Sequence, residues 1–411
     1  PGFGKDPGRF ALAVDLTRIT FPYLLLVSLV TLYSGVLNAL DRFAAAAAAP
    51  ILLNLSMMMT LALAAFFPTA GHAAAWGVLL AGILEFLLVA GDAARHGVLP
   101  RLAWPRIDAE VMVFLKRFGP ATIGSAGTQI ALFADTIIAS FLATGALSAL
   151  YYADRLNQLP IGVIGIAAGT VLLPEMARRV TAGDEAGARH SQNRAIELTL
   201  LLCVPCVVAF LLVPELIMRA MFSRGAFTAA NAQAAGLTLM AYAIGLLPFV
   251  LMRSATVTFL SRGDTTTPVK ALFVAVAVNV ALKVLLMDRY AQVGLAFATS
   301  VGGWINLALL LWFAARQNLL TIDRRLRQSS AKLAVAGAAL AIALLLCERP
   351  VAGLFGGWAT LRDEATLLVL GFIGVVVYGG VVLALFGRQW FAMFRGKARG
   401  KTAPPPDDGT I

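Results

Sequence analysis

Residues 365–386 read ATLLVLGFIGVVVYGGVVLALF, a run that contains no charged side chain. An α-helix needs about 20 consecutive apolar residues to cross the hydrocarbon core of a bilayer. Apolar and polar residues do not alternate along the run, as they would in a strand of a membrane barrel. The run therefore predicts a membrane-spanning helix.

Ten more windows of this kind occur along the 411 residues. Of the whole chain, 59% is apolar and only 13% is charged, against about 25% charged in a typical soluble domain. This composition excludes a soluble globule, and it excludes disorder for the bulk of the chain. We expect an all-α polytopic membrane protein with about 11 transmembrane helices, at approximately 18–40, 47–67, 73–92, 119–143, 148–174, 196–222, 234–261, 267–287, 292–315, 331–347 and 364–386.

The basic residues are distributed unevenly between the two sides of these spans. Of the 33 Lys and Arg residues, 22 fall in the connections on one side and 9 on the other, while Arg155 and Arg253 lie inside spans. Because cytoplasmic loops carry the excess of basic residues, we expect a periplasmic N-terminus and a cytoplasmic C-terminus. Topology then accounts for the net charge of +11, with attraction to membrane lipids as a secondary role, and we expect no nucleic-acid partner.

A weak internal repeat links the two halves of the chain. Phe21-Pro22-Tyr23 opens a span that ends in a polar turn, and Leu247-Pro248-Phe249 lies in a span that ends in another. Both spans cross the membrane in the same direction. A parallel repeat of this kind is typical of transporters in which the substrate path runs between two lobes.

The fifth span carries a polar stripe around Arg155. Helical spacing places Ser148, one of the tyrosines at 151 and 152, Arg155 and Gln158 on one face, with Asp154 beside them. An Arg at the centre of a span costs roughly 2.5–3.5 kcal/mol, so it normally faces a cavity or a partner. A guanidinium can hold a phosphate through two parallel hydrogen bonds, which makes the stripe a candidate anion site. A local Asp154–Arg155 pair, or an Arg155 that reaches the outer surface, is the alternative.

A second set of polar residues lies in other spans. Arg253, inside the seventh span, is a candidate for the same cavity. Asp135 in the fourth span, Asn279 and Lys283 in the eighth and Thr299 in the ninth could meet if their helices adjoin. Such a group would be either a coupling-ion or proton site, or a charge pair between Asp135 and Lys283 that serves packing alone.

Enzymatic and redox chemistry find no support in the sequence. We find no Ser/His/Asp set, paired acidic site or Gly-rich phosphate loop, and the three histidines have unrelated spacings. Cys203 and Cys206 have the Cys-x-x-Cys spacing, but they lie in an apolar span, where two small residues beside Pro205 are the better interpretation. We expect no enzyme activity, no certain metal site and no cofactor.

Several motifs together resemble the MurJ (MviN) family of lipid II flippases over essentially the whole chain. They are Phe21-Pro22-Tyr23, Tyr151-Tyr152-Ala153-Asp154-Arg155, Leu172-Leu173-Pro174-Glu175 and Ser261-Arg262-Gly263-Asp264 with Thr267-Pro268. The resemblance implies a fold of the multidrug/oligosaccharidyl-lipid/polysaccharide (MOP) exporter superfamily. Members of the family move lipid II, the polyprenyl-pyrophosphate-linked peptidoglycan precursor, from the inner to the outer leaflet of the bacterial inner membrane by alternating access.

The resemblance also implies an architecture. The family has fourteen helices, in two pseudo-symmetric lobes around a central cavity plus two C-terminal helices, so we expect about three helices to be missing here. That expectation agrees with a chain that begins at Pro1, and such a fragment should not transport by itself. The implied domains are 1–117 for the rest of the N-lobe, 118–317 for the C-lobe, 318–395 for the two additional helices and 396–411 for a disordered cytoplasmic tail.

Residue roles can be carried over at matching positions. Arg155 would hold the pyrophosphate with Ser148 and Asp154 as neighbours, and the last two helices would border a groove for the polyprenyl tail. Some relatives look as if they bind a cation at the positions of Asp135, Asn279 and Thr299, but Lys283 stands where a second carboxylate would be needed. Coupling to Na⁺ or to membrane potential therefore stays open, and the cell-division or elongation machinery is a candidate partner.

Two rival functions remain from the residues themselves. A MATE-like multidrug exporter, or an exporter of another lipid-linked oligosaccharide, would share the superfold, but a drug exporter for hydrophobic cations calls for an acidic cavity. A membrane glycosyltransferase would need an acidic metal site at the membrane surface, and none is visible.

Overall fold

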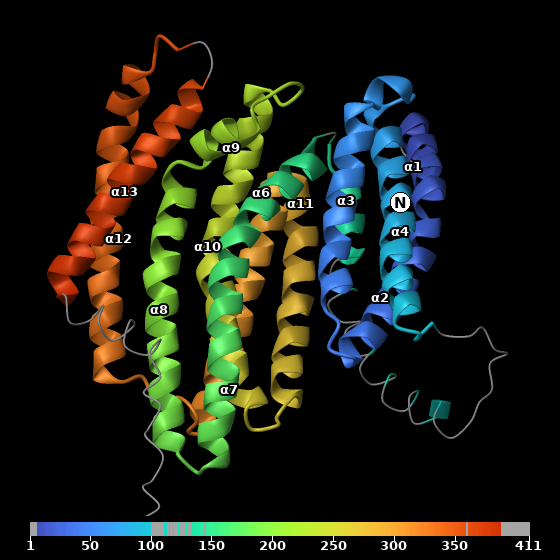
Figure 1. The fold of residues 1–411 in the computed structure, drawn as a ribbon. Coiled ribbons are helices and arrows are strands. Elements are labelled where there is room, and N and C mark those ends of the chain that lie inside the picture. The colour runs from blue at the N-terminus through green and yellow to red at the C-terminus, as the bar shows by residue number, and fades with distance from the viewer. Residues whose placement is uncertain are drawn as a thin grey trace, which may run out of the picture. The chain divides into compact units, whose positions relative to one another are not determined.

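The computed structural model describes residues 6–99, 133–143, 145–358 and 361–387, together with the isolated positions 111, 112, 115, 118, 122 and 129. These residues form helices and turns. The predicted tail at 396–411 and most of the first half of the predicted span 119–143 lie outside the described residues. The chain divides into two compact units, Pro1–Ala121 and Thr122–Ile411 (Figure 1).

The first unit is a group of helices coloured blue in Figure 1. Its helices are α1 (Pro7–Thr20), α2 (Pro22–Ala39), α3 (Ala44–Ala62) and α4 (Ala70–Arg95), with the short 3₁₀ helix η2 (Ala64–Phe66) before α4. The predicted span 18–40 corresponds to α2, and the structure adds the separate helix α1 before it. Asp6 caps α1 by accepting from the N–H groups of Gly8 and Arg9, a local signal that hydropathy does not detect.

Small residues of α4 allow its two neighbours to approach closely. A Cβ added to Gly82 would lie 2.6 Å from the ring of Tyr23 on α2, and one added to Gly77 would collide with Thr60 on α3. Glycine is required at such contacts because any side chain would separate the helices. α4 therefore forms the centre of this unit.

The second unit contains the remaining helices. Residues 133–140 are helical, and the elements after them are α6 (Ala146–Pro160), the π-helix η3 (Ile161–Ile166), α7 (Ala167–Thr181), α8 (Glu185–Leu212), α9 (Pro214–Phe222), α10 (Ala229–Leu260), α11 (Thr266–Arg316), α12 (Arg324–Leu354) and α13 (Arg362–Phe386).

Three local features interrupt these helices. Pro160 is followed by the π-helical turn η3, so the predicted span 148–174 runs through α6, η3 and α7. The predicted span 196–222 was wrong as a single helix, because the chain breaks at Val213 and Pro214 opens α9. The backbone of Ala291 is non-helical, with φ 44° and ψ −129°, so α11 is two helices that meet there. They correspond to the predicted spans 267–287 and 292–315.

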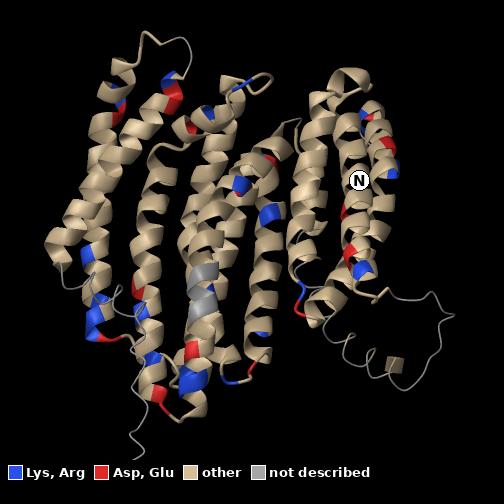
Figure 2. Ribbon diagram, viewed as in Figure 1, with Lys and Arg blue, Asp and Glu red and all other residues tan. Residues whose placement is uncertain are grey.

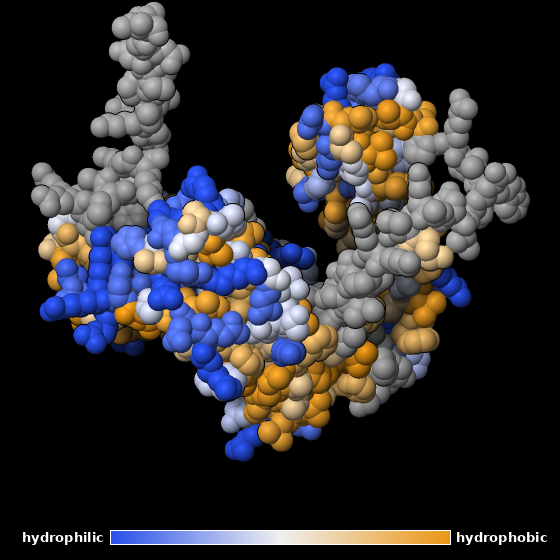
Figure 3. Space-filling view, turned by 90° about the horizontal axis from the view of Figure 1, so that it is seen from below, coloured by the Kyte–Doolittle hydropathy of each residue, from blue (hydrophilic) through white to orange (hydrophobic). Residues whose placement is uncertain are grey.

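Length and composition mark the fold as that of a membrane protein. Among the described residues, eight helices are long and apolar enough to cross a bilayer. Within the second unit, charged residues gather mainly near helix ends (Figure 2). The end-on view of Figure 3 shows hydrophilic residues gathered where helices of that unit end. The prediction of an all-helical membrane protein is confirmed.

Candidate functional site

Arg155 lies on the exposed face of α6. Ser148, Tyr151 and Gln158 share its exposed face, while Ala153 on the opposite face is fully buried. The Arg155 guanidinium carbon lies 4.7 Å from the centre of the Tyr151 ring, an arrangement that fixes the side chain without neutralising it. Helix geometry alone accounts for this stripe, as the sequence predicts.

The carboxylate beside Arg155 is engaged elsewhere. Asp154 accepts a hydrogen bond from Gln158 Nε2 at 3.2 Å. Among the residues that the structure describes, no carboxylate forms an ion pair with Arg155, so the local Asp154–Arg155 pair is not formed. The guanidinium retains its hydrogen-bond donors for another partner.

Arg253 comes from α10 and packs beside the continuation of α6. Its side chain is exposed and crosses the backbone of Gly165 in the π-turn η3, where an added Cβ would lie 3.2 Å from Arg253 Nε. It too makes no ion pair with another described residue. The structure therefore places both arginines that the sequence predicts inside spans along one continuous segment, with Gly165 ten residues beyond Arg155, or about 15 Å of ideal helix.

The ion pair that the sequence left conditional is present. Lys283 Nζ donates to Asp135 Oδ1, and the Lys283 side chain is only 3% exposed while that of Asp135 is 40% exposed. The Lys283 side chain is consequently enclosed by the protein. The charge of Asp154 also interacts with those of Asp135 and Lys283. The two polar groups that appear separate in the sequence thus form one electrostatic cluster.

The other two candidates for a cation site donate hydrogen bonds within α11. Asn279 Nδ2 donates to the carbonyl of Ala298 at 3.2 Å, and Thr299 Oγ1 donates to the carbonyl of Leu295 at 3.0 Å. A hard cation needs several oxygen ligands, but here an ammonium group already occupies the Asp135 carboxylate. The Lys283–Asp135 contact agrees with the charge-pair interpretation, while Asn279 Oδ1 and the Thr299 hydroxyl oxygen keep their capacity to accept.

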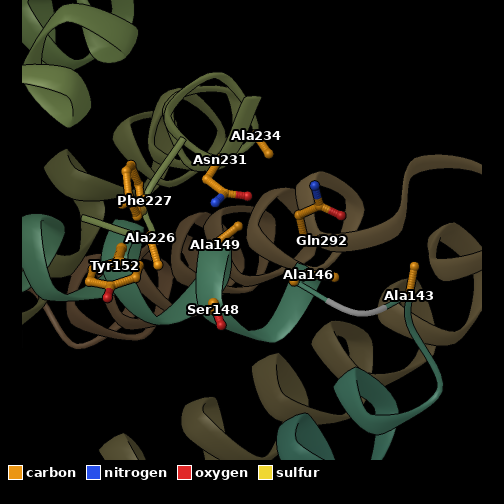
Figure 4. Close-up of a pocket in the computed structure, with 11 residues that line it drawn as sticks. Ala143, Ala146, Ser148, Ala149, Tyr152, Ala226, Phe227, Asn231, Ala234 and Gln292 are labelled. Carbon is orange, nitrogen blue, oxygen red and sulfur yellow. The ribbon is translucent and has the colours of Figure 1, made fainter. Parts of the chain in front are cut away.

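A pocket of about 390 Å³ opens at the start of α6. Ser148 and Tyr152 of α6, Asn231 at the start of α10 and Gln292 beside the break in α11 supply its polar lining. Figure 4 shows the Asn231 and Gln292 carboxamides lying over the first turn of α6. The pocket therefore adjoins the stripe that carries Arg155.

Comparison with known proteins identifies the family. The family model described as "Lipid II flippase MurJ" matches residues 1–360. This chain belongs to the MurJ family. The resemblance expected from the motifs is confirmed, and the family is one of transporters and not of enzymes.

Individual relatives agree with this assignment. A probable lipid II flippase MurJ of Rhizobium tropici is 38% identical over 99% of this chain and 77% of the relative. Its counterpart in Rhizobium meliloti (strain 1021) is 36% identical over 98% of this chain and 76% of the relative. Among solved structures, "Lipid II flippase MurJ, inward closed conformation" is similar with a TM-score of 0.75 at 22% identity, covering 95% of this chain and 76% of that one. The last match concerns the fold alone.

Sequence reasoning on this MurJ-family chain missed several polar residues. Glu85 of α4 is 4% exposed, and it makes no hydrogen bond or ion pair with another described residue. Its position inside the predicted span 73–92 was a usable signal, since intramembrane carboxylates are rare. Asn231 and Gln292 lie at helix ends, where no periodic pattern singles them out.

Proposed function

We propose that this MurJ-family chain translocates lipid II from the inner to the outer leaflet of the bacterial inner membrane. The observation that carries the proposal is the family match over residues 1–360. The site agrees with it, because a flippase for a pyrophosphate-linked lipid needs a cation inside the membrane, and Arg155 forms no ion pair with a carboxylate that the structure describes.

Arg155 is the proposed pyrophosphate ligand. Its guanidinium offers the planar pair of donors that matches two phosphate oxygens, and Tyr151 beneath it limits the number of rotamers to be fixed on binding. Asp154 is held by Gln158 and leaves those donors free. Arg253 is proposed as a second cation farther along the substrate path. Ser148 is proposed as a hydroxyl donor at the outer end of that path.

The proposed topology has eleven spans, a periplasmic N-terminus and a cytoplasmic C-terminus, supported by the basic-residue count of 22 against 9. The proposed organisation is the rest of an N-lobe at 1–117, a C-lobe at 118–317 and two additional helices at 318–395, with substrate moving by alternating access. Because an ammonium group occupies the Asp135 carboxylate, membrane potential acting on the intramembrane charges is the proposed driving force.

The test is complementation of a bacterial strain depleted of its own lipid II flippase. The full-length native gene is expressed, with and without Arg155→Ala, and lipid II on the outer leaflet is quantified. We expect the wild-type protein to restore growth and exposure of lipid II, and Arg155→Ala to fail at equal membrane abundance.

Arg224→Ala provides the matched control, because this arginine is 71% exposed and pairs with Glu364 at a helix end. It should rescue as well as the wild type. If Arg155→Ala rescued normally, the pyrophosphate assignment would be wrong. If the wild-type protein reached the membrane and left lipid II on the inner leaflet, the exporter alternative would replace the flippase, and transport of hydrophobic cations would be measured next.

A further inference from the structure

The pocket at the start of α6 has a lining of one chemical kind. Its polar groups are two carboxamides, Asn231 and Gln292, and the Ser148 and Tyr152 hydroxyls, and none of its lining residues is charged. Amides and hydroxyls both donate and accept hydrogen bonds. Such a lining suits a neutral ligand rich in amide and hydroxyl groups, and it offers nothing specific to an ion.

Aromatic packing gives the pocket a fixed wall. The Tyr152 ring centre lies 4.8 Å from that of Phe222 and 5.1 Å from that of Phe227. These contacts join α6 to the end of α9 and to the connection before α10. A Tyr ring held in this way presents an apolar surface with a polar tip, which is suited to the faces and hydroxyls of a sugar ring.

The two carboxamides are placed by the local backbone. Asn231 lies in the first turn of α10, where its N–H donates to the capping Thr228 hydroxyl at 3.4 Å. Gln292 directly follows Ala291, whose positive φ costs of order 1–3 kcal/mol in a residue with a side chain. Neither carboxamide hydrogen-bonds to another residue that the structure describes, so both remain available to a ligand.

Position along α6 relates the pocket to Arg155. Ser148 precedes Arg155 by seven residues on the same exposed face, which is two helical turns or about 10 Å. A sugar joined directly to a pyrophosphate at Arg155 would reach that far. The basic-residue asymmetry directs the start of α6 toward the periplasm, so the pocket lies on the outward side of the arginine.

We propose that this pocket is a headgroup subsite that binds the uncharged N-acetylated sugar of the substrate through Asn231 and Gln292. The inference rests on the proposed flippase function and deepens it, because it separates recognition of the sugar from recognition of the pyrophosphate. A volume of about 390 Å³ is within the usual range for small-ligand pockets.

The test compares two lipids on the purified protein in nanodiscs. One is lipid II, and the other is undecaprenyl pyrophosphate, which has the same lipid and pyrophosphate but no sugar. The double variant Asn231→Leu/Gln292→Leu should bind lipid II about tenfold more weakly, as expected for the loss of two neutral hydrogen bonds, and should bind undecaprenyl pyrophosphate as the wild type does. Arg155→Ala should weaken binding of both lipids.

Gln233→Leu is the matched control, since this residue is on α10 but lines a different pocket; its lipid II affinity should not change. The single variants, each expected to lose about threefold, replace the double variant if the latter does not fold. Unchanged lipid II binding, or equal loss for both lipids, would overturn the subsite. A wild-type protein that bound neither lipid would instead remove the flippase proposal and this inference with it.

Discussion

The arginines of the second unit that form ion pairs differ from Arg155 and Arg253. Arg194 pairs with Glu197 and Asp323, and Arg219 pairs with Glu215 at 2.6 Å and Asp363 at 3.2 Å. Arg155 and Arg253 make no ion pair with any carboxylate that the structure describes. Paired arginines thus connect helices, whereas the two without a described ion pair are the proposed ligands of the substrate.

The paired region is built around a buried carboxylate. Glu197 of α8 is completely buried, and it accepts from Arg194 and from Ser329 of α12, with Arg325 Nε 3.6 Å away. Asn193 Nδ2 adds a hydrogen bond to the Thr321 carbonyl at 2.9 Å. These contacts fix the start of α12 against α8, so this region should govern stability, while Arg155 should govern transport.

The largest effect on stability is expected from Glu197→Ala. Removing a buried carboxylate leaves two guanidinium groups without their shared partner, and we expect the free energy of unfolding to fall by about 3 kcal/mol. Thermal unfolding in detergent measures this change. Glu197→Gln should lose less, because the amide oxygen still accepts from Ser329. Arg155→Ala should leave the unfolding temperature unchanged, and a comparable loss there would break the division between the two regions.

The second effect concerns the ion pair between Asp135 and Lys283. It lies inside predicted spans, as Arg155 does, and it is a formed ion pair, as that of Arg194 is. Asp135→Asn strands the buried Lys283 ammonium, and it should cost about 2 kcal/mol because Asp154 offers partial compensation. Lys283→Met should cost less, since Asp135 is 40% exposed. The double variant should be more stable than Asp135→Asn alone, as measured by thermal unfolding. Loss of transport without loss of stability in these variants would argue for a direct role in coupling.

A smaller effect is expected from Arg155→Lys. This variant keeps the positive charge and loses the planar pair of donors, so lipid II affinity should fall about tenfold if both donors contact phosphate. Binding to the protein in nanodiscs measures it. Affinity equal to that of the wild type would mean that charge alone matters for lipid II binding. Arg155 would then differ from Arg194 by its place in the fold and not by the geometry of its guanidinium.

The smallest effect is expected in the polar turn before α11, where threonines and not arginines supply the hydrogen bonds to a carboxylate. Asp264 accepts from Thr267 Oγ1 at 2.6 Å and from the N–H groups of Thr266 and Thr267 at 3.0 Å. The Thr267 hydroxyl, with those backbone groups, lowers the pKa of Asp264. Asp264→Ala should cost about 1 kcal/mol, as for the loss of a helix cap.

The lowered pKa of Asp264 makes the stability of the protein depend on pH. A carboxyl whose pKa is lower in the folded state stabilises the protein above its unfolded pKa, and this contribution is lost as the pH falls through the folded pKa. The difference in unfolding temperature between the wild type and Asp264→Ala should therefore shrink on acidification. A difference that stayed constant in acid would show that Asp264 acts by packing and not through its charge.

Much of this structure could be predicted from the sequence, but not all. Hydropathy located the two helices that meet at Ala291, and helical periodicity located the stripe around Arg155, because both signals are local. The break at Val213 was missed since apolar residues continue across it. The contacts of Glu197 with α12 join residues more than 100 positions apart, and periodicity carries no information about such pairs. The carboxamides of Asn231 and Gln292 were missed because they lie at helix ends, where no periodic pattern singles them out.

The contact between Gly165 and Arg253 has a consequence for the evolution of this family. A methyl group at position 165 would lie 3.2–3.3 Å from the Arg253 side chain, which would have to shift by a few tenths of an ångström to make room. Chains that keep an arginine at position 253 should keep glycine at 165, and those that acquire alanine there should have replaced the arginine with a smaller residue. Replacing Arg253 first removes the contact, so that order of changes meets no clash, whereas alanine at position 165 first would displace the arginine side chain.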